Sequence, residues 1–417
     1  MMDGMKQTGI RWIGEVPQEW TLIKMKHFSY MKGRIGWQGL TADEFIDEGP
    51  YLITGTDFEN GKVCWDRCYH ISEKRYNEAV PIQVHVGDVL VTKDGTIGKL
   101  AYIDSLPDKA SLNSHLLVIR PIGEKYINRF LYWVLYSSVF QGYYEFESYG
   151  STMDSLSQEK IGDFSFFAPP VKEQKKIADY LDVECAKLDS IIETLTQQIR
   201  VLRLYKKRII LDAVTKGIDG ENAKQVKMDY CNSVCESWEH TRVKYFCRMY
   251  SGDNLTSEEI DVEGDYPVYG GNGLRGFYSD YTNEGESVLI GRQGALCGNV
   301  HIVNGKFWAT DHAIVTYPIT NVDNRFLFYL FSAMDLNQYS MTAAQPGLAV
   351  YTIQNLDLYI PSIKAEQTKI ANYLDIKCRT VDEVLMVKKQ QLKTVQLHKE
   401  SLIFEYVTGK KRVKEVI

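Results

Sequence analysis

Apolar residues recur at alternating steps of four and three along two segments of the chain that contain neither proline nor glycine. The mean spacing of about 3.5 residues is typical of a coiled coil rather than of a surface helix. The first seam consists of Leu181, Cys185, Leu188, Ile192, Leu195, Ile199, Leu202, Lys206, Ile209 and Ala213. The second consists of Leu374, Cys378, Val381, Leu385, Lys388, Leu392, Val395, Lys399, Leu402 and Tyr406. The pattern predicts two long helices, over 171–217 and 362–417, whose seams cover each other.

The two helical segments are copies of one sequence. Residues 173–182 and 366–375 match at an offset of 193 positions (366 − 173), and the match continues without a gap to the ends of the helices. Lys206 and Lys399 interrupt the seam at the same slot, where a polar residue usually specifies register. The alternative, a core helix inside each domain, is disfavoured because helices in globular proteins average about 11 residues.

The helices divide the remaining chain into two segments, 1–170 and 218–361, which we predict to be similar domains. Each ends in a strand-like apolar run closed by proline, and each holds short Val-, Ile-, Tyr- and Phe-rich runs bounded by Gly, Asp and Asn. These features indicate strands and turns. Short amphipathic helices are expected near 129–140 and 325–336. The predicted fold class is α+β, with two sheet-rich domains each followed by a long helix.

Composition and motifs narrow the possible functions. The net charge of −6 argues against a protein that coats nucleic acid without specificity, although a local basic face stays possible. No run of 18 apolar residues is present, so we expect a cytoplasmic protein without a membrane span. The cysteine spacing lacks the pattern of a zinc site. Phosphate-binding, dinucleotide-binding and hydrolase motifs are also missing from the sequence, which favours a binding device over an enzyme.

Three glycine-containing loops offer side chains suited to DNA. Arginine pairs with guanine edges, asparagine and glutamine with adenine, and lysine often with phosphate. The alternative for every one of these loops is a hairpin turn with solvated charges. The candidate DNA-binding residues are Lys93, Thr96, Lys99, Tyr269, Asn272, Arg275, Arg292 and Gln293.

The chain resembles the specificity subunit of type I restriction-modification systems. The resemblance is carried by the repeated segments 173–182 and 366–375, by the entry sequence at 13–20, and by the Tyr-Pro-Val-Tyr-Gly-Gly-Asn-Gly run at 266–273. It covers essentially the whole chain, and the ordered duplication is more specific than any single motif.

The resemblance implies that each domain reads one half of a split DNA sequence and that the two helices pair antiparallel as a ruler for the gap. Two modification (methyltransferase) subunits would dock on the helices and domains, and restriction subunits would join them. S-adenosylmethionine, ATP and Mg would then belong to these partners, with no cofactor, metal or catalytic residue in this chain. The residues expected in helix pairing and subunit docking are Leu181, Leu188, Ile192, Leu195, Ile199, Leu374, Val381, Leu385, Leu392 and Val395.

Two other functions stay open from the sequence. One is a scaffold that bridges two copies of a partner without touching DNA. The other is a stand-alone nuclease or methyltransferase with a cryptic site, for which Asp88, Asp94 and Lys93 form the one acidic and basic cluster worth nominating.

Overall fold

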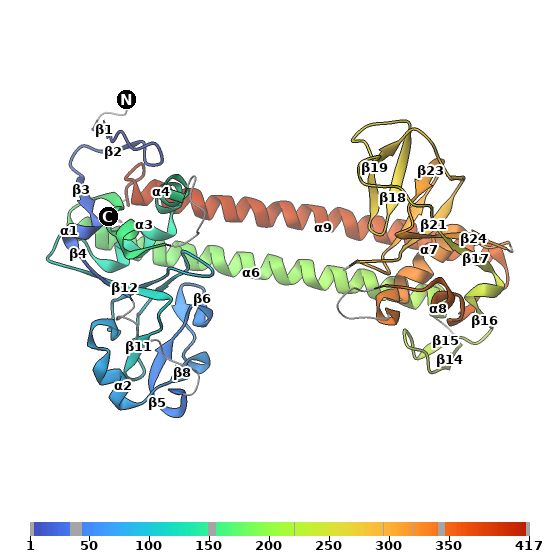
Figure 1. Ribbon diagram of the computed structural model, residues 1–417, viewed down its shortest axis with the longest axis horizontal. Helices are drawn as coiled ribbons and strands as arrows, with labels where there is room; N and C mark the ends of the chain where they lie inside the picture. The colour runs from blue at the N-terminus through green and yellow to red at the C-terminus, as the bar shows by residue number, and fades with distance from the viewer. Residues whose placement is uncertain are drawn as a thin grey trace. The chain divides into compact units, whose positions relative to one another are not determined.

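The computed structural model describes residues 4–33, 44–148, 156–220, 222–294, 296–319, 321–340 and 347–413 (Figure 1). The chain divides into two compact units. Unit 1 comprises Met1–Thr194 and Gln391–Ile417, and unit 2 comprises Leu195–Gln390. Each unit therefore combines one sheet-rich domain with a part of both long helices.

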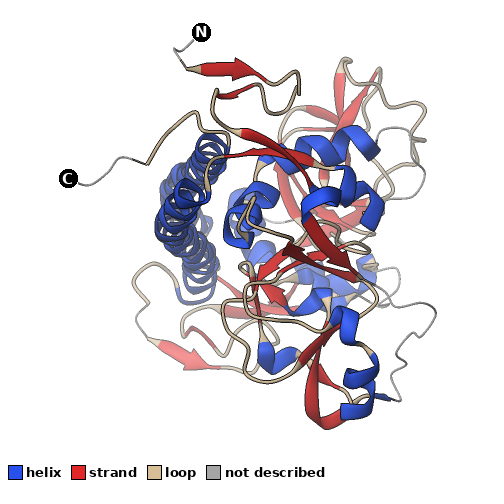
Figure 2. Cartoon of the chain, turned by 90° about the vertical axis from the view of Figure 1, so that its left-hand side faces the viewer, coloured by secondary structure: helices blue, strands red, loops and turns tan. Residues whose placement is uncertain are grey.

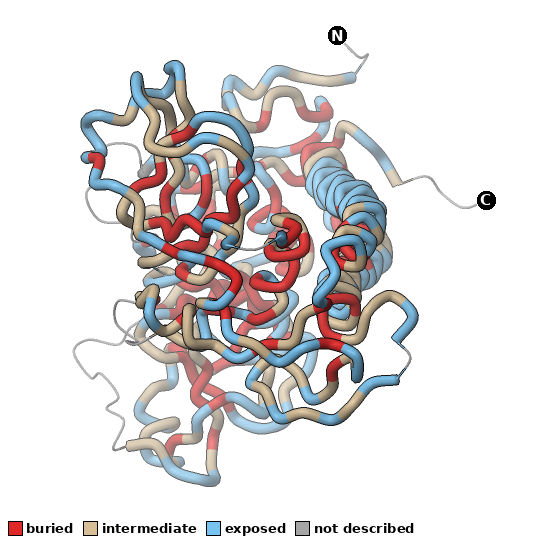
Figure 3. Tube along the Cα trace, turned by 90° about the vertical axis from the view of Figure 1, so that its right-hand side faces the viewer, coloured by how far each residue is buried: buried red, intermediate tan, exposed pale blue. Residues whose placement is uncertain are grey.

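The two long helices are α6 (Val171–Lys216) and α9 (Lys364–Val407). Every predicted seam position is buried or half-buried, whereas most residues between these positions are exposed. The half-buried seam residues are Leu188, Ile192, Leu202, Lys206, Ile209, Lys388, Leu392 and Val395. Much of the coiled trace of the long helices is accordingly pale blue in Figure 3. In the described part of the chain, no helix is long and apolar enough to span a membrane.

Two ion pairs show that the helices run antiparallel within each unit. In unit 1, the Nζ atom of Lys399 donates to the carboxylate of Asp189 at 2.6 and 2.8 Å, and the rings of Tyr180 and Tyr406 lie 4.6 Å apart. In unit 2, Lys206 donates to Asp382 at 2.7 and 2.6 Å. The two pairs are copies of each other, because Lys206 precedes Lys399 by 193 positions and Asp189 precedes Asp382 by the same number.

Within the described residues, five sheets form the domain of unit 1, which faces the viewer in Figure 2. The main sheet has the strand order β4-β12-β9-β10 and a second has β11-β5-β8, while β1-β2, β3-β13 and β6-β7 are two-stranded. The strands are β1 (Met5–Gln7), β2 (Glu15–Pro17), β3 (Thr21–Lys24), β4 (Ser29–Lys32), β5 (Ile46–Ile53), β6 (Phe58–Glu59), β7 (Lys62–Val63), β8 (Tyr69–His70), β9 (Val89–Thr92), β10 (Leu100–Tyr102), β11 (Ala110–Leu112), β12 (Leu116–Pro121) and β13 (Ser165–Ala168). The helices are α1 (Met25–Phe28), α2 (Glu73–Glu78), α3 (Asn128–Tyr136), α4 (Ser138–Ser148) and α5 (Gln158–Asp163).

The domain of unit 2 repeats the main sheet and the closing strand pair of unit 1. Its main sheet has the order β17-β24-β21-β22, and β16 pairs with β25 as β3 pairs with β13. The strands are β14 (Ala223–Gln225), β15 (Ser233–Cys235), β16 (Glu239–Arg242), β17 (Cys247–Ser251), β18 (Tyr266–Gly270), β19 (Gly273–Tyr278), β20 (Asn283–Glu284), β21 (Ser287–Gly291), β22 (Val300–Val303), β23 (Lys306–Ala309), β24 (Ala313–Pro318) and β25 (Asp357–Ile360). The helices are α7 (Asn324–Ala333) and α8 (Val350–Gln354). The predicted pair of sheet-rich domains, each followed by a long helix, is confirmed.

The start of each long helix lies in the core of the preceding domain. Ile177 and Leu181 of α6 belong to one apolar cluster with Phe130 of α3, and Leu374 of α9 shares a cluster with Phe326 of α7. The central strands β9 and β21 are buried along their whole length, as continuous apolar runs predict. Domain and helix therefore fold as one body in each unit.

One expectation about the short helices needs correction. A single helix was predicted near 129–140, but α3 ends at Tyr136 and α4 begins at Ser138. Ser137 has an extended backbone, and its hydroxyl accepts a hydrogen bond from the amide of Val139 at 3.3 Å. Serine competes with helical hydrogen bonding in this way, so the apolar period continues across a break in the backbone. In unit 2, α7 likewise ends at Ala333, and Leu336 begins a separate 3₁₀ turn.

The seam ion pairs give a matched stability prediction. Lys399 is 8% exposed, and although burial alone would lower the pKa of its ammonium, the bonds to Asp189 and the neighbouring Tyr136 raise it overall. Asp189→Ala strands this buried charge, so we expect a loss of about 1–3 kcal/mol of unfolding free energy. Asp382→Ala removes the more exposed copy and should cost less than about 1 kcal/mol. Urea unfolding followed by circular dichroism measures both.

The double variant Asp189→Ala/Lys399→Met serves as the control, because it leaves no unpaired charge at this position of the seam. It should recover most of the lost stability. Equal losses for Asp189→Ala and Asp382→Ala would contradict the prediction.

Candidate nucleic-acid interface

Each domain holds a cation directly after its central strand, and three segments of chain fix that residue's backbone. In unit 1 the amide of Lys93 donates to the carbonyl of His115 at 2.9 Å, and the Lys93 carbonyl accepts from the amide of Leu156 at 2.9 Å. The same two bonds, both 2.8 Å long, occur in unit 2 among Arg292, His312 and Leu348. The two loops are therefore equivalent, and each presents a half-buried cation from a fixed backbone.

The loop after β9 is closed by the hydroxyl of Thr92. That hydroxyl donates to the carbonyl of Thr96 at 2.5 Å and accepts from the amide of Lys99 at 2.9 Å, which leaves the side chains of Thr96 and Lys99 exposed. Lys99 also lines a cavity of about 990 Å³ together with Tyr132. Among the described residues, neither Lys93 nor Lys99 has a side-chain hydrogen bond or ion pair. Both ammonium groups are thus available to an anion.

The acidic and basic cluster nominated as a catalytic alternative does not assemble. Asp88 is buried and binds the guanidinium of Arg120 through both oxygens, at 2.7 and 2.8 Å. Asp94 lies instead beside His115, with 3.4 Å between its oxygen and the ring Nδ1. Asp88 is therefore a structural residue of the sheet, and Lys93 has no role in a shared site with it.

Two loops of unit 2 that are far apart in sequence lie against each other. A Cβ atom on Gly271 would stand 3.1 Å from the carbonyl O of Gln293, and one on Gly291 would stand 2.1 Å from the carbonyl O of Gly271. Only glycine permits this approach at Gly291. The glycine-rich turn between β18 and β19 therefore packs on the loop that carries Arg292. Tyr269, at the base of this turn, is half-buried and packs against Phe307 with the ring centroids 5.8 Å apart.

Four polar side chains stand around this junction. Arg292 donates to the carbonyl of Asp311 at 3.3 Å, which leaves most of its guanidinium donors unused, and Gln293 has no side-chain bond within the described residues. Asn272 is exposed, and its amide oxygen accepts from Asn299 at 2.9 Å. Arg275 is exposed and donates to the hydroxyl of Ser257 at 3.2 Å. These donors and acceptors suit the edges of bases as well as phosphates.

Two residues at this junction escaped the sequence argument. Asn299 joins Asn272, as described above, and His301 places its ring within 3.2 Å of an ideal Cβ on Gly273. The Nε2 atom of His301 is buried without a partner among the residues described, and burial lowers the pKa of this histidine. Both follow the same loop as Arg292, so a search of the whole 292–301 segment for polar side chains would have found them.

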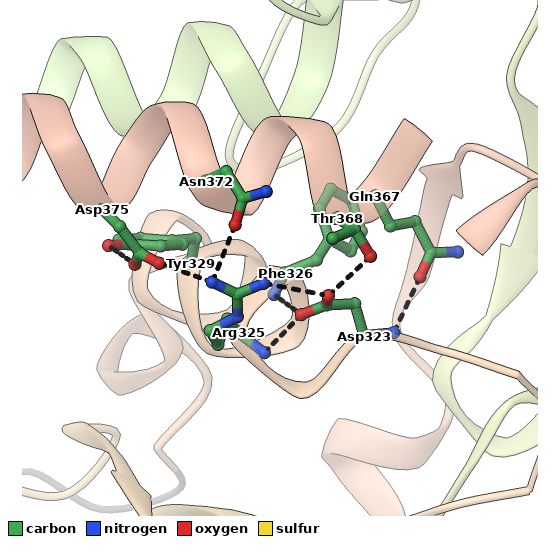
Figure 4. Close-up of polar contacts among 8 residues, drawn as sticks. All are labelled: Asp323, Arg325, Phe326, Tyr329, Gln367, Thr368, Asn372 and Asp375. Carbon is green, nitrogen blue, oxygen red and sulfur yellow. Dashed lines mark hydrogen bonds and ion pairs between the residues drawn. The ribbon is translucent and has the colours of Figure 1, made fainter. Parts of the chain in front are cut away.

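A polar cluster attaches α7 to α9 in unit 2 (Figure 4). The guanidinium of Arg325 binds Asp375 at 2.8 Å and the amide oxygen of Asn372 at 2.9 Å, while the hydroxyl of Tyr329 donates to Asp375 at 2.7 Å. Burial alone would lower the pKa of Arg325, but the charges of Asp323 and Asp375 raise it overall. The repeated aspartate of the helix motif is therefore the acceptor that holds the domain.

Asp323 and Gln367 complete the cluster at the start of α9 (Figure 4). Asp323 caps α7 through the amides of Arg325 and Phe326, at 2.9 and 3.2 Å, and accepts from Thr368 at 2.7 Å. Burial would raise the pKa of Asp323, yet these hydrogen bonds lower it overall. The buried side chain of Gln367 accepts from the amide of Asp323 at 3.0 Å. Its amide group also donates to the carbonyl of residue 361 at 2.8 Å.

Unit 1 builds the same attachment with different neighbours. Arg129 binds Asp182 at 2.6 Å, and the indole of Trp133 donates to Asp182 at 2.8 Å. The guanidinium of Arg129 also lies 4.5 Å from the ring centroid of Tyr102. Gln174 is fully buried and forms three bonds, accepting from the amide of residue 127 and donating to the carbonyls of residues 125 and 169, at 2.9, 3.0 and 2.7 Å. The Gln and Asp of the repeated motif thus attach the long helix to the preceding domain in both copies.

A protein-family model matches the sequence of this chain. The model for the type I restriction modification DNA specificity domain matches residues 32–201 and again residues 235–394, which are 170 and 160 of the 417 residues. The chain belongs to the type I restriction-modification DNA specificity family. Within a type I system this subunit provides recognition of the DNA target and is not the catalytic component.

Relatives support the assignment over different lengths. The chain is 40% identical over 147 residues to the specificity subunit of the Escherichia coli type I restriction enzyme EcoprrI, a match that covers 34% of this chain and 37% of that relative. It is 24% identical over 424 residues to the putative MjaX specificity subunit of Methanocaldococcus jannaschii, covering 96% of both chains. The second match extends the similarity to specificity subunits over nearly the whole chain.

A solved structure agrees with the fold. A chain from a study of complex assembly and conformational transition of the type I R-M system aligns with 95% of this chain and 99% of its own length, at a TM-score of 0.70 and 14% identity. At this identity the likeness supports the specificity-subunit fold alone.

The buried glutamines give a prediction about how the domains are attached. Gln174→Leu leaves one amide and two carbonyls without partners, and we expect a loss of about 2–4 kcal/mol. Gln367→Leu leaves one amide and one carbonyl and should cost about 1–3 kcal/mol. Hydrogen exchange followed by mass spectrometry should show faster exchange around each substituted glutamine only, with the other unit unchanged.

The exposed neighbour Lys175 offers a control on the same turn of α6. Lys175→Leu should leave exchange unchanged. Protection lost in both units after a single glutamine substitution would rule out a local attachment.

Proposed function

We propose that each unit reads one half of a bipartite DNA target through the loops that follow β9 and β21. The observation that carries this proposal is the equivalence of the two loops: the same backbone bonds hold Lys93 and Arg292, yet the side chains around them differ. Two loops with equivalent backbones and different side chains suit two half-targets of different sequence. The long helices then keep the two half-targets apart.

The chemistry of the loops divides the work between affinity and specificity. In unit 1, Lys93, Thr96 and Lys99 suit phosphate, because an ammonium is a point charge and a hydroxyl adds a hydrogen bond. In unit 2, Arg292 and Gln293 suit base edges, because a guanidinium grips guanine in two places and an amide matches adenine. Asn272 and Arg275 extend the same junction, and the half-buried Tyr269 supports it from below.

We further propose that two modification subunits dock on the outer faces of the helices, one for each unit. The seam residues are taken up by helix pairing, so docking falls to exposed apolar residues. These occur as two equivalent sets, each offset by 193 positions: Val183, Ile191 and Leu397 in unit 1, and Ile376, Val384 and Leu204 in unit 2. Two matching sets fit two copies of one partner. We infer that each set forms part of the surface on which one modification subunit docks.

The cofactors follow from this division. S-adenosylmethionine, ATP and Mg would serve the modification and restriction subunits, and this chain would add the target sequence. The complex would act where the DNA is, in the cytoplasm. A scaffold that only bridges two partners would also use the two apolar sets. It gives no purpose to Lys93 and Arg292, which follow the two central strands and have no carboxylate partner among the described residues.

A methylome tests the reading of two half-targets. With its modification subunit, the chain should produce a bipartite methyladenine motif in a host that lacks other adenine methyltransferases. Arg292→Ala should relax one position of one half-target, costing about 1–3 kcal/mol there. Lys93→Ala should weaken binding to all sequences. It should also reduce the salt slope, which is the slope of log affinity against log salt concentration, by about one unit. No sequence preference in the unsubstituted complex would exclude the proposal, and an altered base in both halves would exclude independent reading.

Native mass spectrometry tests the docking faces. Val183→Glu/Leu397→Glu places charges in the apolar set of unit 1, so we expect a complex with one modification subunit instead of two. Ile376→Glu/Leu204→Glu should remove the other copy, and all four substitutions should remove both. Val262→Glu, at an apolar residue 89% exposed in the domain of unit 2, is the control and should keep both subunits. Full assembly in the fourfold variant would refute this assignment.

A further inference from the structure

Three cations form a stripe along one side of α6 in unit 2. Arg200, Arg203 and Lys207 are exposed and follow one another at steps of three and four, the spacing that places residues on one face of a helix. We call them the cationic stripe. It extends about 10 Å along the helix at 1.5 Å per residue, which corresponds to about three base pairs of DNA.

Neither the helix dipole nor surface ion pairing accounts for the stripe. The dipole favours cations only within the last turn, whereas Lys207 lies nine residues before the end of α6 at Lys216. The flanking cations do have carboxylate partners: Lys206 binds Asp382 and Arg208 binds Asp212. Within the residues that the structure describes, the three members of the stripe have none.

The stripe is also absent from the other copy of the helix. At the positions 193 residues later, α9 carries Lys393, Gln396 and Glu400, whose charges cancel. The seam, the seam ion pairs and the exposed apolar sets are all repeated between the helices. The ligand that binds the stripe is therefore not a partner that binds both units in the same way.

The side of α6 on which the stripe lies indicates what the stripe binds. Ile210, three residues beyond Lys207, lines a cavity of about 660 Å³ with Phe328 and Tyr329 of α7. The stripe continues this side of α6, the side on which the domain of unit 2 sits. Among the exposed apolar residues of α6, Val201 and Tyr205 occupy a different face, whereas Leu204 lies beside the stripe, four residues after Arg200.

We propose that the cationic stripe binds phosphates of the unspecified gap, in the stretch that adjoins the half-target read by unit 2. This inference rests on the proposed function, since it concerns the same duplex. Two guanidinium groups and one ammonium, without competing carboxylates, match the repeated negative charge of a DNA backbone. The contact is blind to sequence and adds affinity rather than specificity, as an unspecified gap requires.

The test uses the full chain assembled with its modification subunits. In the stripe variant Arg200→Gln/Arg203→Gln/Lys207→Gln, the polar, helix-compatible side chain already present at Gln396 replaces all three cations. Binding to target and to random duplexes should weaken alike, and the salt slope should fall by about two to three units, since each phosphate contact contributes about 0.9. The methylated sequence should not change.

A second duplex locates the contact. Methylphosphonates in the gap remove its phosphate charges, so the unsubstituted complex should lose affinity on this duplex while the stripe variant should bind it as well as ordinary DNA. The control Lys172→Gln/Lys175→Gln/Lys227→Gln removes three exposed cations elsewhere and should change the slope by less than one unit. Native mass spectrometry shows whether each complex keeps both modification subunits.

Three results would overturn the proposal: an unchanged slope in the stripe variant, equal sensitivity of both complexes to methylphosphonates, or loss of a modification subunit from the stripe variant. The last would assign the stripe to an acidic protein surface. If the unsubstituted complex showed no sequence preference, the proposed function would be wrong instead. The salt slope would still test the stripe, because it is measured on total binding to duplex DNA.

Discussion

A long helix that begins inside a domain needs partners for the backbone groups around its first turn, and one buried glutamine in each half provides them. Gln174 and Gln367 each accept from an amide at the start of α3 or α7 and donate to the carbonyl that closes the last strand. Three segments of chain, the strand end, the short helix and the long helix, meet at one side chain. Without it, burial of the helix start would leave polar groups unpaired in the core.

The aspartate eight residues further along each helix extends this attachment. Asp182 and Asp375 lie two turns above the glutamine, where Arg129 and Arg325 reach them from the short helix. Two contact points on one rigid helix fix an orientation that one point would leave free to rotate. The direction in which each domain presents its loops therefore follows from four side chains of the repeated motif, and the seam beyond them is available for pairing.

The sequence was sufficient for the helices and insufficient for the loops, for a physical reason. A seam depends on a local period, and a period of 3.5 residues can be read without knowing the fold; each predicted seam position proved buried or half-buried. The junction in unit 2 depends on the approach of Gly271 to Gly291, twenty residues apart, which no period reveals. The break at Ser137 shows that a period can also mislead, because the apolar period continues although the helix stops.

The two copies share some features and differ in others. The buried glutamines recur at the offset of 193 and make the same contacts in both units, and the exposed apolar sets, on which we propose that one partner docks in each unit, recur at the same offset. Features that differ, such as Lys93 against Arg292 or the stripe against Gln396 and Glu400, stand on equivalent backbone positions and so are not imposed by the fold. Under the proposed function, an asymmetric duplex would use such differences, since two half-targets and a gap would present different chemistry to two domains of the same fold.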